Sequence, residues 1–571
     1  MNPKTPANEF PRRWIAPTAI FDRWETAATY YDDLLRRPIA SAADFDRWLL
    51  DWSEVDAVFE EEYARRYTSM TCQTDDQARE QLFMDFVENI KPLREPVHHQ
   101  LAQRYIDAAA RFDLPPMRYE VLTRSLRTQI RMFRQQNVPL ETENEKFVTQ
   151  YQQTIGAMTV RFRGEEKTLP QMSLLLEERD RATREEAWRL TADRYLHDAR
   201  ELDGLYEKMV ALRATIARNA DYPDFRAYKF DELERFDYSP AHCAAFHDAI
   251  ERVVVPAAKS LNADRKRRLA LDRLRPWDLA VDVFGKPALR PFEKVERLMD
   301  GCEAIFGRVH RELGEIFAGL RQRDLLDLES RKGKAPGGYQ ATFPEARTPF
   351  IFMNAVGSDD DVRTLLHEGG HAFHTWACRE EPLIAYREAP TEFAEVASMG
   401  MECLAAPFMD HFYGADTPRA QRDFFEKIVL FLPYMACVDA FQHFVYTHAD
   451  AGIETWKDHW VHLCKRFDTG VDWSGLELYE RHLWHRKLHI FELPFYYIEY
   501  GIAQLGALQV WLASRKNFEQ AVAEYRYGLA LGGSRPLPEL FAAAGCRFEF
   551  SEAIMRPLID AVMEEVRRNS D

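Results

Sequence analysis

The sequence predicts a mainly α-helical fold with one small β-sheet. Charged and apolar residues recur at spacings of three and four along most of the chain, which is the period of an amphipathic helix. Strand-like alternation is confined to a few short runs, and no repeat typical of helical arrays is visible. A length of 571 residues is enough for two to four domains of about 150 residues each.

Six long segments carry the helical period. They are Ala42–Glu62, Asp76–Leu114, Leu174–Ala217, Pro240–Leu271, Glu293–Leu320 and Gln421–Asp450. Between two of them, the proline-bearing stretch Leu274–Pro291 is typical of a connector. Helices on this scale predict a core that is built mainly by helix packing.

Three short segments carry the strand signal. Ala157–Arg163 alternates apolar and polar residues and leads into Gly164-Glu165, which suits a hairpin turn. Tyr339–Phe343 and Phe350–Asn354 are short runs set between glycine and proline residues. One small sheet is therefore expected beside the helices.

Composition and charge exclude several classes of protein. A net charge of -17 disfavours nucleic acids and anionic membranes as partners, because both attract basic surfaces. Eight cysteines with no CxxC pair are expected to be reduced and buried. Met1–Trp14 contains no apolar signal core, and the most apolar run, Ile428–Val438, is too short to span a bilayer. We therefore expect a soluble, cytoplasmic protein.

The pentapeptide His367-Glu368-Gly369-Gly370-His371 is the strongest functional signal. Histidines at i and i+4 lie on one side of a helix and can reach one metal ion, as in the HExxH motif. Ser358, with Asp361 three residues later, predicts the start of that helix. On this helix one stripe carries His367, His371 and His374, and the opposite stripe carries the apolar residues Val362, Leu365, Leu366, Phe373 and Trp376.

The two glycines of the motif need an explanation, because each costs about 1 kcal/mol relative to alanine inside a helix. Close approach of a substrate or a strand would offset that cost, and so would tight packing between helices. The sequence does not choose between these two explanations.

The third ligand of a catalytic zinc must come from elsewhere in the chain. His374 lies seven residues after His367, about 10 Å along the helix axis, which is too far for the same ion. Ala377 stands where the metzincin motif has its third histidine. Pro390–Ser398 reads as the start of a second helix, and its Glu392 and Glu395 share a face. One of the two is expected to be the ligand, and the other could orient a histidine.

Three segments resemble the oligoendopeptidase F branch of the thimet-oligopeptidase-like zinc metallopeptidases. They are Pro349–His374, Glu392–Ser398 and His489–Ala503, with a weaker likeness through Thr159–Ala187. The resemblance implies two helical halves around a deep channel that admits only short peptides. It implies an N-terminal helical region over residues 1–190, a catalytic domain over residues 191–571, and one zinc ion per chain.

The resemblance also implies roles for particular residues. The matching zinc ligands are His367, His371 and Glu395, and Glu368 matches the general base. His489, Tyr497 and Tyr500 match residues that contact the scissile carbonyl, although an offset of about one residue makes Tyr496 an alternative to Tyr497. Gly337-Gly338-Tyr339 and Pro349–Asn354 match the loop and strand beside the substrate. The candidate substrate-binding residues are Tyr339, Phe350, Phe352, Asn354 and Tyr496.

The residue types fit hydrolysis of a peptide bond on their own chemistry. Zinc lowers the pKa of a bound water to about 7 and polarises a carbonyl. Glu368, next to His367, can accept the water proton and pass it to the leaving amine. Tyrosine hydroxyls and an imidazole suit the oxyanion, and the backbone of Phe350–Asn354 could pair with an extended peptide as an added strand.

Two other functions fit part of the pattern. A zinc aminopeptidase shares HExxH plus a distant glutamate, but the nearest stretch to its GxMEN-like element is Phe352-Met353-Asn354-Ala355, which is not a match. A catalytically idle peptide-binding protein is disfavoured, because the base, the ligands and the tyrosines are all present. Cobalt or manganese could replace zinc, and the sequence leaves the oligomeric state open.

Overall fold

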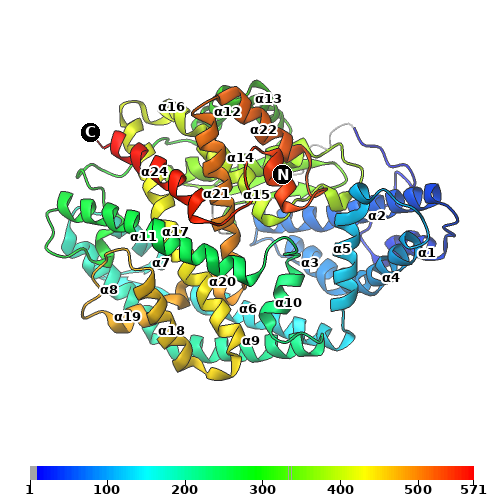
Figure 1. Ribbon diagram of the computed structural model, residues 1–571, viewed down its shortest axis with the longest axis horizontal. Coiled ribbons are helices and arrows are strands. Elements are labelled where there is room, and N and C mark those ends of the chain that lie inside the picture. Colours follow the sequence, from blue (N-terminus) through cyan, green and yellow to red (C-terminus); the bar gives the residue numbers. More distant parts are fainter. Residues whose placement is uncertain (1–8, 332, 336, 571) are drawn as a thin grey trace. The chain divides into compact units, whose positions relative to one another are not determined.

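A computed structural model describes residues 9–331, 333–335 and 337–570. The described residues form mostly helices, with two small sheets (Figure 1). This confirms the predicted mainly α fold. The chain divides into two compact units, each built from three segments. Unit 1 comprises Met1–Arg131, Arg290–Ala420 and Ala503–Phe548, and unit 2 comprises Met132–Leu289, Gln421–Ile502 and Glu549–Asp571. Neither unit begins or ends at residue 190, where the sequence analysis places a domain boundary.

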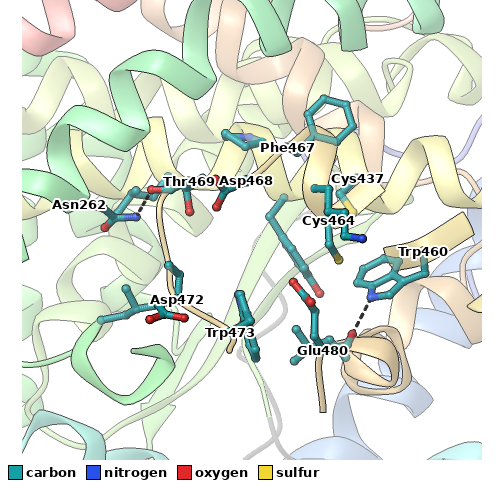
Figure 2. A pocket seen from close by; sticks show the side chains of 17 residues that line it. Asn262, Cys437, Trp460, Cys464, Phe467, Asp468, Thr469, Asp472, Trp473 and Glu480 are labelled. Atoms are coloured by element: carbon teal, nitrogen blue, oxygen red, sulfur yellow. Dashed lines mark hydrogen bonds between the residues drawn. The ribbon is translucent and has the colours of Figure 1, made fainter. Parts of the chain in front are cut away.

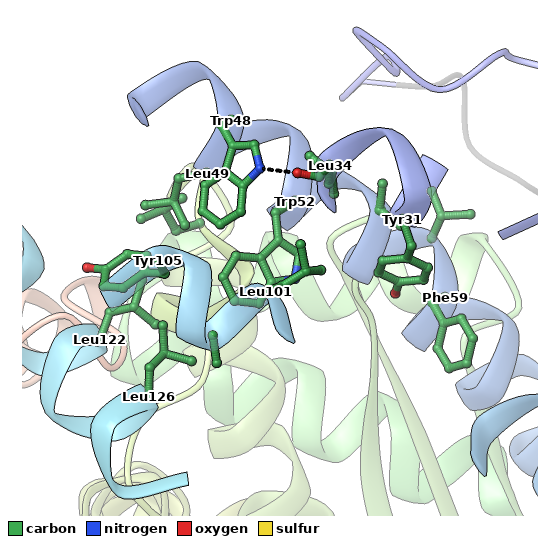
Figure 3. Packing of buried hydrophobic residues seen from close by; sticks show 14 of the residues in the cluster. Tyr31, Leu34, Trp48, Leu49, Trp52, Phe59, Leu101, Tyr105, Leu122 and Leu126 are labelled. Carbon is green, nitrogen blue, oxygen red and sulfur yellow. Dashed lines mark hydrogen bonds between the residues drawn. The ribbon is translucent and has the colours of Figure 1, made fainter. Parts of the chain in front are cut away.

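The N-terminal helices of unit 1 pack around an aromatic core (Figure 3). Ser41 caps the second of them, because its side chain accepts a hydrogen bond from the backbone N–H of Asp44. The Trp48 indole is fully buried and donates to the Leu34 carbonyl over 2.9 Å, which satisfies its one polar atom. The helices are α1 (Trp24–Arg36), α2 (Ala42–Cys72), α3 (Gln77–Asp85), α4 (Lys91–Ala109) and α5 (Pro116–Met132).

A three-stranded sheet in unit 1 lies against the helix that carries HExxH. Its strands are β3 (Leu326–Glu329), β4 (Tyr339–Phe343) and β5 (Thr348–Ala355). The order is β3-β5-β4, with β5 parallel to β3 and antiparallel to β4. The small sheet expected beside the helices is therefore confirmed, and it lies next to the helix that carries HExxH. Strand β3 was not predicted, and its four residues alternate between leucine and acidic side chains.

The helix that carries HExxH is α14 (Asp359–Ala377). The other helices of this part of unit 1 are α12 (Val295–Val309), α13 (Arg311–Gln322), α15 (Thr391–Ala405), α16 (Asp410–Tyr413), α22 (Phe518–Ala530) and α23 (Leu537–Ala543). Helix α14 contacts α15, β4, β5 and α22. HExxH therefore lies on a helix that is held on several sides.

Unit 2 is helical apart from one hairpin, β1 (Thr159–Phe162) and β2 (Glu165–Thr168). The hairpin turn falls at Arg163 and Gly164, both with positive φ, one residue earlier than expected. The helices are α6 (Val138–Gly156), α7 (Leu169–Leu174), α8 (Arg181–His197), α9 (Ala199–Asn219), α10 (Phe225–Glu232), α11 (Pro240–Arg268), α18 (Ile453–Arg466), α19 (Glu477–Arg481), α20 (Leu488–Phe491) and α24 (Glu552–Arg568). Two further helices, α17 (Thr417–Thr447) and α21 (Tyr497–Ser514), each contain a boundary between the units.

Two predicted helical segments are broken where the periodicity continues. Glu293–Leu320 divides at His310, whose backbone is extended and whose ring accepts a hydrogen bond from the N–H of Glu312 to cap the next helix. Leu174–Ala217 divides twice: residues 178–180 separate the 3₁₀ turn Leu175–Glu177 from α8, which Asp180 caps, and Asp198 separates α8 from α9. A cap within a continuous hydrophobic pattern is hard to recognise, because the same residue types also occur inside helices.

One helical stretch, Asp410–Thr447, is long and apolar enough to cross a membrane. However, 67% of its most apolar window is buried inside the protein, which is typical of a core helix. The apolar run Ile428–Val438 is too short to span a bilayer, as expected, but the helical stretch that contains it is longer than the run.

Candidate active site

Helix α14 begins and packs as the sequence predicts. The side chain of Ser358 accepts from the N–H of Asp361, and the Asp361 carboxylate accepts from the N–H of Ser358 over 2.7 Å. The apolar stripe from Val362 to Phe373 is buried, whereas Trp376 is half-buried beneath the Arg379 guanidinium, 4.0 Å from the ring centroid. This packing fixes the direction in which the opposite face points.

The two glycines of the motif allow close packing between helices. A Cβ atom on Gly370 would lie 2.5 Å from the carbonyl oxygen of Ala397 in α15. A Cβ atom on Gly369 would lie 2.4 Å from the ring of Phe306 in α12. Of the two explanations left open by the sequence, tight helix packing is therefore the one that the structure supports.

His367, His371 and Glu395 come together from α14 and α15. Oε2 of Glu395 lies 3.3 Å from Nε2 of His367 and 3.7 Å from Nε2 of His371. One ligand atom from each of the three residues lies within 4.8 Å of the others. Atoms bound to one zinc ion are about 3–4 Å apart, since zinc–ligand bonds are near 2 Å. The spacing therefore fits a single metal ion.

Two more side chains hold this group in place. Nδ1 of His367 lies 2.8 Å from Oε1 of Glu402, and the Ser398 hydroxyl donates to Oε2 of Glu395 over 2.9 Å. Sequence reasoning missed Glu402 and considered Glu392 for the orienting role. The group that could hold a metal does not include Glu392. Glu402 follows Glu395 by seven residues, or two helical turns, so the two carboxylates share a face of the helix. This spacing could have indicated that Glu402 lies near the histidines.

Burial and nearby charges have opposing effects on the pKa values of His367, His371 and Glu395. Burial lowers the pKa of His371 to about 4. Burial would also lower that of His367, but hydrogen bonds to Glu395 and Glu402 raise it well above its ordinary value. Burial would raise the pKa of Glu395, yet the two imidazoles lower it to about 2. Glu395 is therefore an ionised carboxylate, as a metal ligand must be.

Glu368 is a buried carboxyl group beside this cluster. Its side chain is almost fully enclosed, and burial raises its pKa to about 7. The charge of Glu395 raises the pKa further, whereas His367 and the backbone of Gln340 in β4 oppose the shift. A carboxyl group in this environment takes up and releases a proton near neutral pH.

His374 belongs to the core. Burial lowers the pKa of its imidazole to about 3, and the ring packs edge-on against Phe393, 6.0 Å between centroids. This position is consistent with the expectation that His374 does not bind the same ion as His367. The face of α14 that carries the three histidines is covered by α15 at His374, so this histidine is buried there.

Strand β4 runs along α14. At its start, Gly338 lies against Thr364 of α14, and near its end the Thr342 hydroxyl lies 3.1 Å from that of Thr375. In the middle of the strand, the backbone of Gln340 hydrogen-bonds to the Glu368 side chain. β4 is an edge strand of its sheet, whereas β5 is paired on both sides. The expectation that Phe350–Asn354 adds a peptide strand is therefore wrong for β5. In this sheet the open edge beside α14 belongs to β4.

The candidate substrate-binding residues of unit 1 mainly build this sheet. Tyr339 stacks on Phe352 with 4.7 Å between centroids, and its hydroxyl lies 2.5 Å from that of Thr71. Phe350 and Phe352 are buried. Asn354 donates from Nδ2 to the carbonyls of Ala335 and Gly337. These contacts position the glycine-bearing loop that leads into β4.

The other predicted residues form a ring cluster in unit 2. The His489 ring lies 5.0 Å from Tyr497 and 5.9 Å from both Tyr496 and Tyr500. Tyr496 and Tyr500 are half-buried, whereas Tyr497 is buried beneath the ammonium of Lys487, 4.0 Å from its ring centroid. Burial lowers the pKa of His489 to about 4, so this imidazole is neutral near pH 7.

Phe491 and Phe495 are fully buried, as expected for core residues. Phe491 stacks on Tyr151 with 4.2 Å between centroids, and Phe495 packs on Phe230 and His443. Both residues precede the tyrosines in the chain, and they anchor the segment that leads into Tyr496 and Tyr497.

Unit 2 also contains a pocket of about 510 Å³, and its lining residue Tyr434 packs edge-on against Tyr497, 6.1 Å between ring centroids (Figure 2). Asn262 donates to the carbonyl of Thr469 and Trp460 donates to that of Glu480, which fixes part of its wall. None of the candidate site residues lines this pocket. We therefore do not place the predicted chemistry there.

Residues 174–558 match the model of peptidase family M3. The chain belongs to peptidase family M3. This confirms the family expected from HExxH, the EFAEVAS segment and the tyrosine-rich segment. The match includes all the candidate metal-binding residues and the ring cluster of unit 2.

Several relatives of this family M3 chain are known. The oligoendopeptidase F homolog of Lactococcus lactis subsp. lactis is 29% identical over 134 residues, which is 24% of this chain and 22% of that protein. Oligopeptidase PepF of Bacillus subtilis is 25% identical over 211 residues, 36% of this chain and 31% of that protein. These alignments therefore cover a fifth to a third of the curated relatives' own length. The structure of Pz peptidase A with an inhibitor has a TM-score of 0.88 at 26% identity and covers 96% of this chain and 97% of its own.

Proposed function

We propose that this family M3 protein is a zinc-dependent endopeptidase that hydrolyses internal bonds of short peptides. The observation that carries the proposal is the convergence of His367, His371 and Glu395, with the Glu368 carboxyl group beside them. The relatives named oligoendopeptidase and oligopeptidase support a substrate class of short peptides.

The residues present fit zinc. Two imidazoles and a carboxylate are a known ligand set of catalytic zinc, and three protein ligands leave one position for water or substrate. Glu402 beside Nδ1 of His367 supplies the carboxylate partner that metal-bound histidines commonly have. When bound, zinc would polarise the peptide carbonyl and acidify a water molecule.

The proton steps fall to Glu368. It follows His367 directly in the chain, and its carboxyl group is enclosed beside the ligand cluster. In our proposal it accepts a proton from the attacking water and delivers that proton to the leaving amine. No other residue described above combines this placement with a carboxylate that is not needed as a ligand.

The family resemblance assigns the carbonyl contact to His489, Tyr497 and Tyr500. Phenol hydroxyls and an imidazole N–H are suitable donors to the oxyanion of the transition state. In support, these three rings form one cluster with the ring of Tyr496, and Tyr496 and Tyr500 are partly exposed.

For the peptide backbone we propose the edge of β4. An extended peptide that pairs with an edge strand gains affinity from main-chain hydrogen bonds, which is tolerant of sequence. β4 lies along α14 near Glu368, so a peptide on this edge would pass the proposed general base. Tyr339, Phe350, Phe352 and Asn354 would then support the strand rather than contact the peptide directly.

Mass-spectrometric mapping of cleavage in peptides of graded length tests this function. We expect cuts at internal bonds of short peptides with both termini blocked, and loss of nearly all turnover in Glu368→Gln with zinc retained. Cleavage restricted to peptides with a free amino terminus would favour an aminopeptidase. Zinc binding with no cleavage of any peptide would favour an idle peptide-binding protein.

A further inference from the structure

Unit 2 contains a second cluster of metal-ligand side chains. Cys243 and His247 lie four residues apart on α11, and Asp439 and His443 lie four residues apart on α17 (Figure 1). Residues at i and i+4 share one face of a helix. Nε2 of His247 lies 2.8 Å from Oδ2 of Asp439, so the two faces meet.

The spacing fits one ion. One ligand atom from each of Cys243, Asp439 and His443 lies within 4.8 Å of the others. Nε2 of His443 lies 3.2 Å from Oδ2 of Asp439, close to the 3.3 Å between His367 and Glu395 in unit 1. Separations of about 3–4 Å are those of atoms that share one zinc ion.

Two of the ligand atoms are buried without a hydrogen bond. Asp439 is 0% exposed, and its Oδ1 has no hydrogen-bond partner in the described part of the chain. Nε2 of His443 is also buried without a hydrogen-bond partner in that part of the chain, because its contact with Oδ2 of Asp439 does not have hydrogen-bond geometry. Buried polar atoms are nearly always paired, so two such atoms beside one thiol require an explanation. A bound cation would satisfy both.

The carboxyl group of Asp439 is fully buried between His443 and His247. A buried carboxylate is costly, since its charge is removed from water, and a bound cation would offset that cost.

We propose that Cys243, Asp439 and His443 bind a second divalent metal ion, with His247 holding the Asp439 carboxylate through Oδ2. A thiolate and an imidazole select zinc or a similar transition metal over magnesium and calcium. This site is distinct from the catalytic group of unit 1, and its existence does not depend on the proposed peptidase activity.

The ion would join α11 to α17 and support the tyrosine segment. The His443 ring packs against Phe495, 5.2 Å between centroids, and Phe495 directly precedes Tyr496. Phe495 adopts a positive φ of 68°, which a residue with a Cβ holds only when its surroundings impose it. Fixing His443 would therefore help to hold the backbone from which Tyr496 and Tyr497 project.

Cobalt titration of the metal-free full-length chain tests the proposal, because only a cysteine ligand gives a thiolate-to-cobalt charge-transfer band in the near ultraviolet. The catalytic group contains no cysteine. We expect two Co²⁺ per chain and one such band. The double variant His367→Ala/His371→Ala should bind one Co²⁺ and keep the band.

Cys243→Ser should lose the band and one equivalent of Co²⁺, whereas the control Cys546→Ala, also a buried thiol, should keep both. Zn²⁺ should raise the Tm of the double variant by several degrees, as binding to the folded state requires, and should not do so when Cys243→Ser is added. Absence of the band in the wild type, or its survival in Cys243→Ser, would overturn the second site. If the proposed metal site of unit 1 did not exist, the wild type and the double variant would each bind one Co²⁺ per chain. Both proteins would then still show the charge-transfer band.

Discussion

Oε1 of Glu402 lies 2.8 Å from Nδ1 of His367, on the side of the ring opposite the nitrogen that faces Glu395. With a metal bound, this contact would favour the tautomer that leaves Nε2 available to the metal, and it holds the plane of the ring. In the proposed metal site, helix α15 would therefore supply both the carboxylate ligand, Glu395, and the carboxylate that orients a histidine ligand, Glu402.

Replacing Glu402 should weaken metal binding more than it weakens the fold. We expect Glu402→Gln to lower zinc affinity about 10- to 100-fold, because the oriented charge on Nδ1 is lost. Competition with a chelator measures this affinity. The control Glu519→Gln, an exposed glutamate on α22, should leave it unchanged. Equal zinc affinity in Glu402→Gln and wild type would show that the contact has no orienting role.

Gly370→Ala should destabilise the contact between α14 and α15. The new Cβ would lie 2.5 Å from the Ala397 carbonyl oxygen and 2.6 Å from the Ser398 Cα, and backbone atoms cannot rotate away. Overpacking of this kind costs about 1–3 kcal/mol, and the shift of α15 would also move Glu395. Thermal unfolding measures the first effect and zinc content measures the second.

Gly307→Ala is the matched control for that substitution. Gly307 lies in α12 with nothing within 4 Å of its added Cβ. Alanine should stabilise the helix there by about 0.5–1 kcal/mol. A Gly370→Ala protein that unfolds no earlier than wild type would contradict the packing explanation of the motif glycines.

The tyrosine cluster makes a prediction about kcat. If Tyr497 and Tyr500 donate to the oxyanion, Tyr497→Phe and Tyr500→Phe should each lower kcat about 10²- to 10³-fold with little change in KM. Tyr496→Phe should keep most of the wild-type kcat. A larger loss in Tyr496→Phe than in Tyr497→Phe would move the role to Tyr496, which is the more exposed of the two.

Acid stability should depend on Asp56 in the N-terminal helices. Burial would raise the pKa of this carboxyl, but the charge of Arg94 and contacts with His98 and Tyr31 hold it well below its usual range. A depressed pKa adds stability above the unfolded value of about 3.9, and that stability is lost as the pH falls. Asp56→Asn should therefore lower the Tm at pH 7, with a difference that shrinks below about pH 4.

Asp32→Asn is the control for this pH dependence. Asp32 pairs with Arg36 at an exposed position on α1, where an ion pair contributes at most about 0.5 kcal/mol. Its Tm should follow that of the wild type across the pH range. A constant Tm difference for Asp56→Asn from pH 7 to pH 3 would contradict the ionised state inferred for Asp56.

Local patterns predicted α14 well. The Ser358 cap, the buried stripe and the bounds of β4 all followed from residues adjacent in sequence, where capping and periodicity act. Glu395 was one of two alternatives by spacing, because a helix start of unknown orientation does not determine which carboxylate faces its neighbour. Only the packing of α15 against Gly370 brings Glu395 to both histidines.

Long-range relationships could not be predicted from one sequence. The edge position of β4 depends on β3, whose short acidic sequence gives little strand signal. The role of Glu402 depends on the rotation of α15, and the cluster around Asp439 depends on α11 meeting α17 across nearly two hundred residues. Each of these contacts joins segments whose patterns are ordinary when read alone.

Anomalous diffraction at the zinc absorption edge, from crystals of protein that cleaves peptides, tests the central claim most directly. We predict a zinc peak within bonding distance of Nε2 of His367, Nε2 of His371 and a carboxylate oxygen of Glu395. Active crystals without a metal peak at these three atoms would contradict the claim.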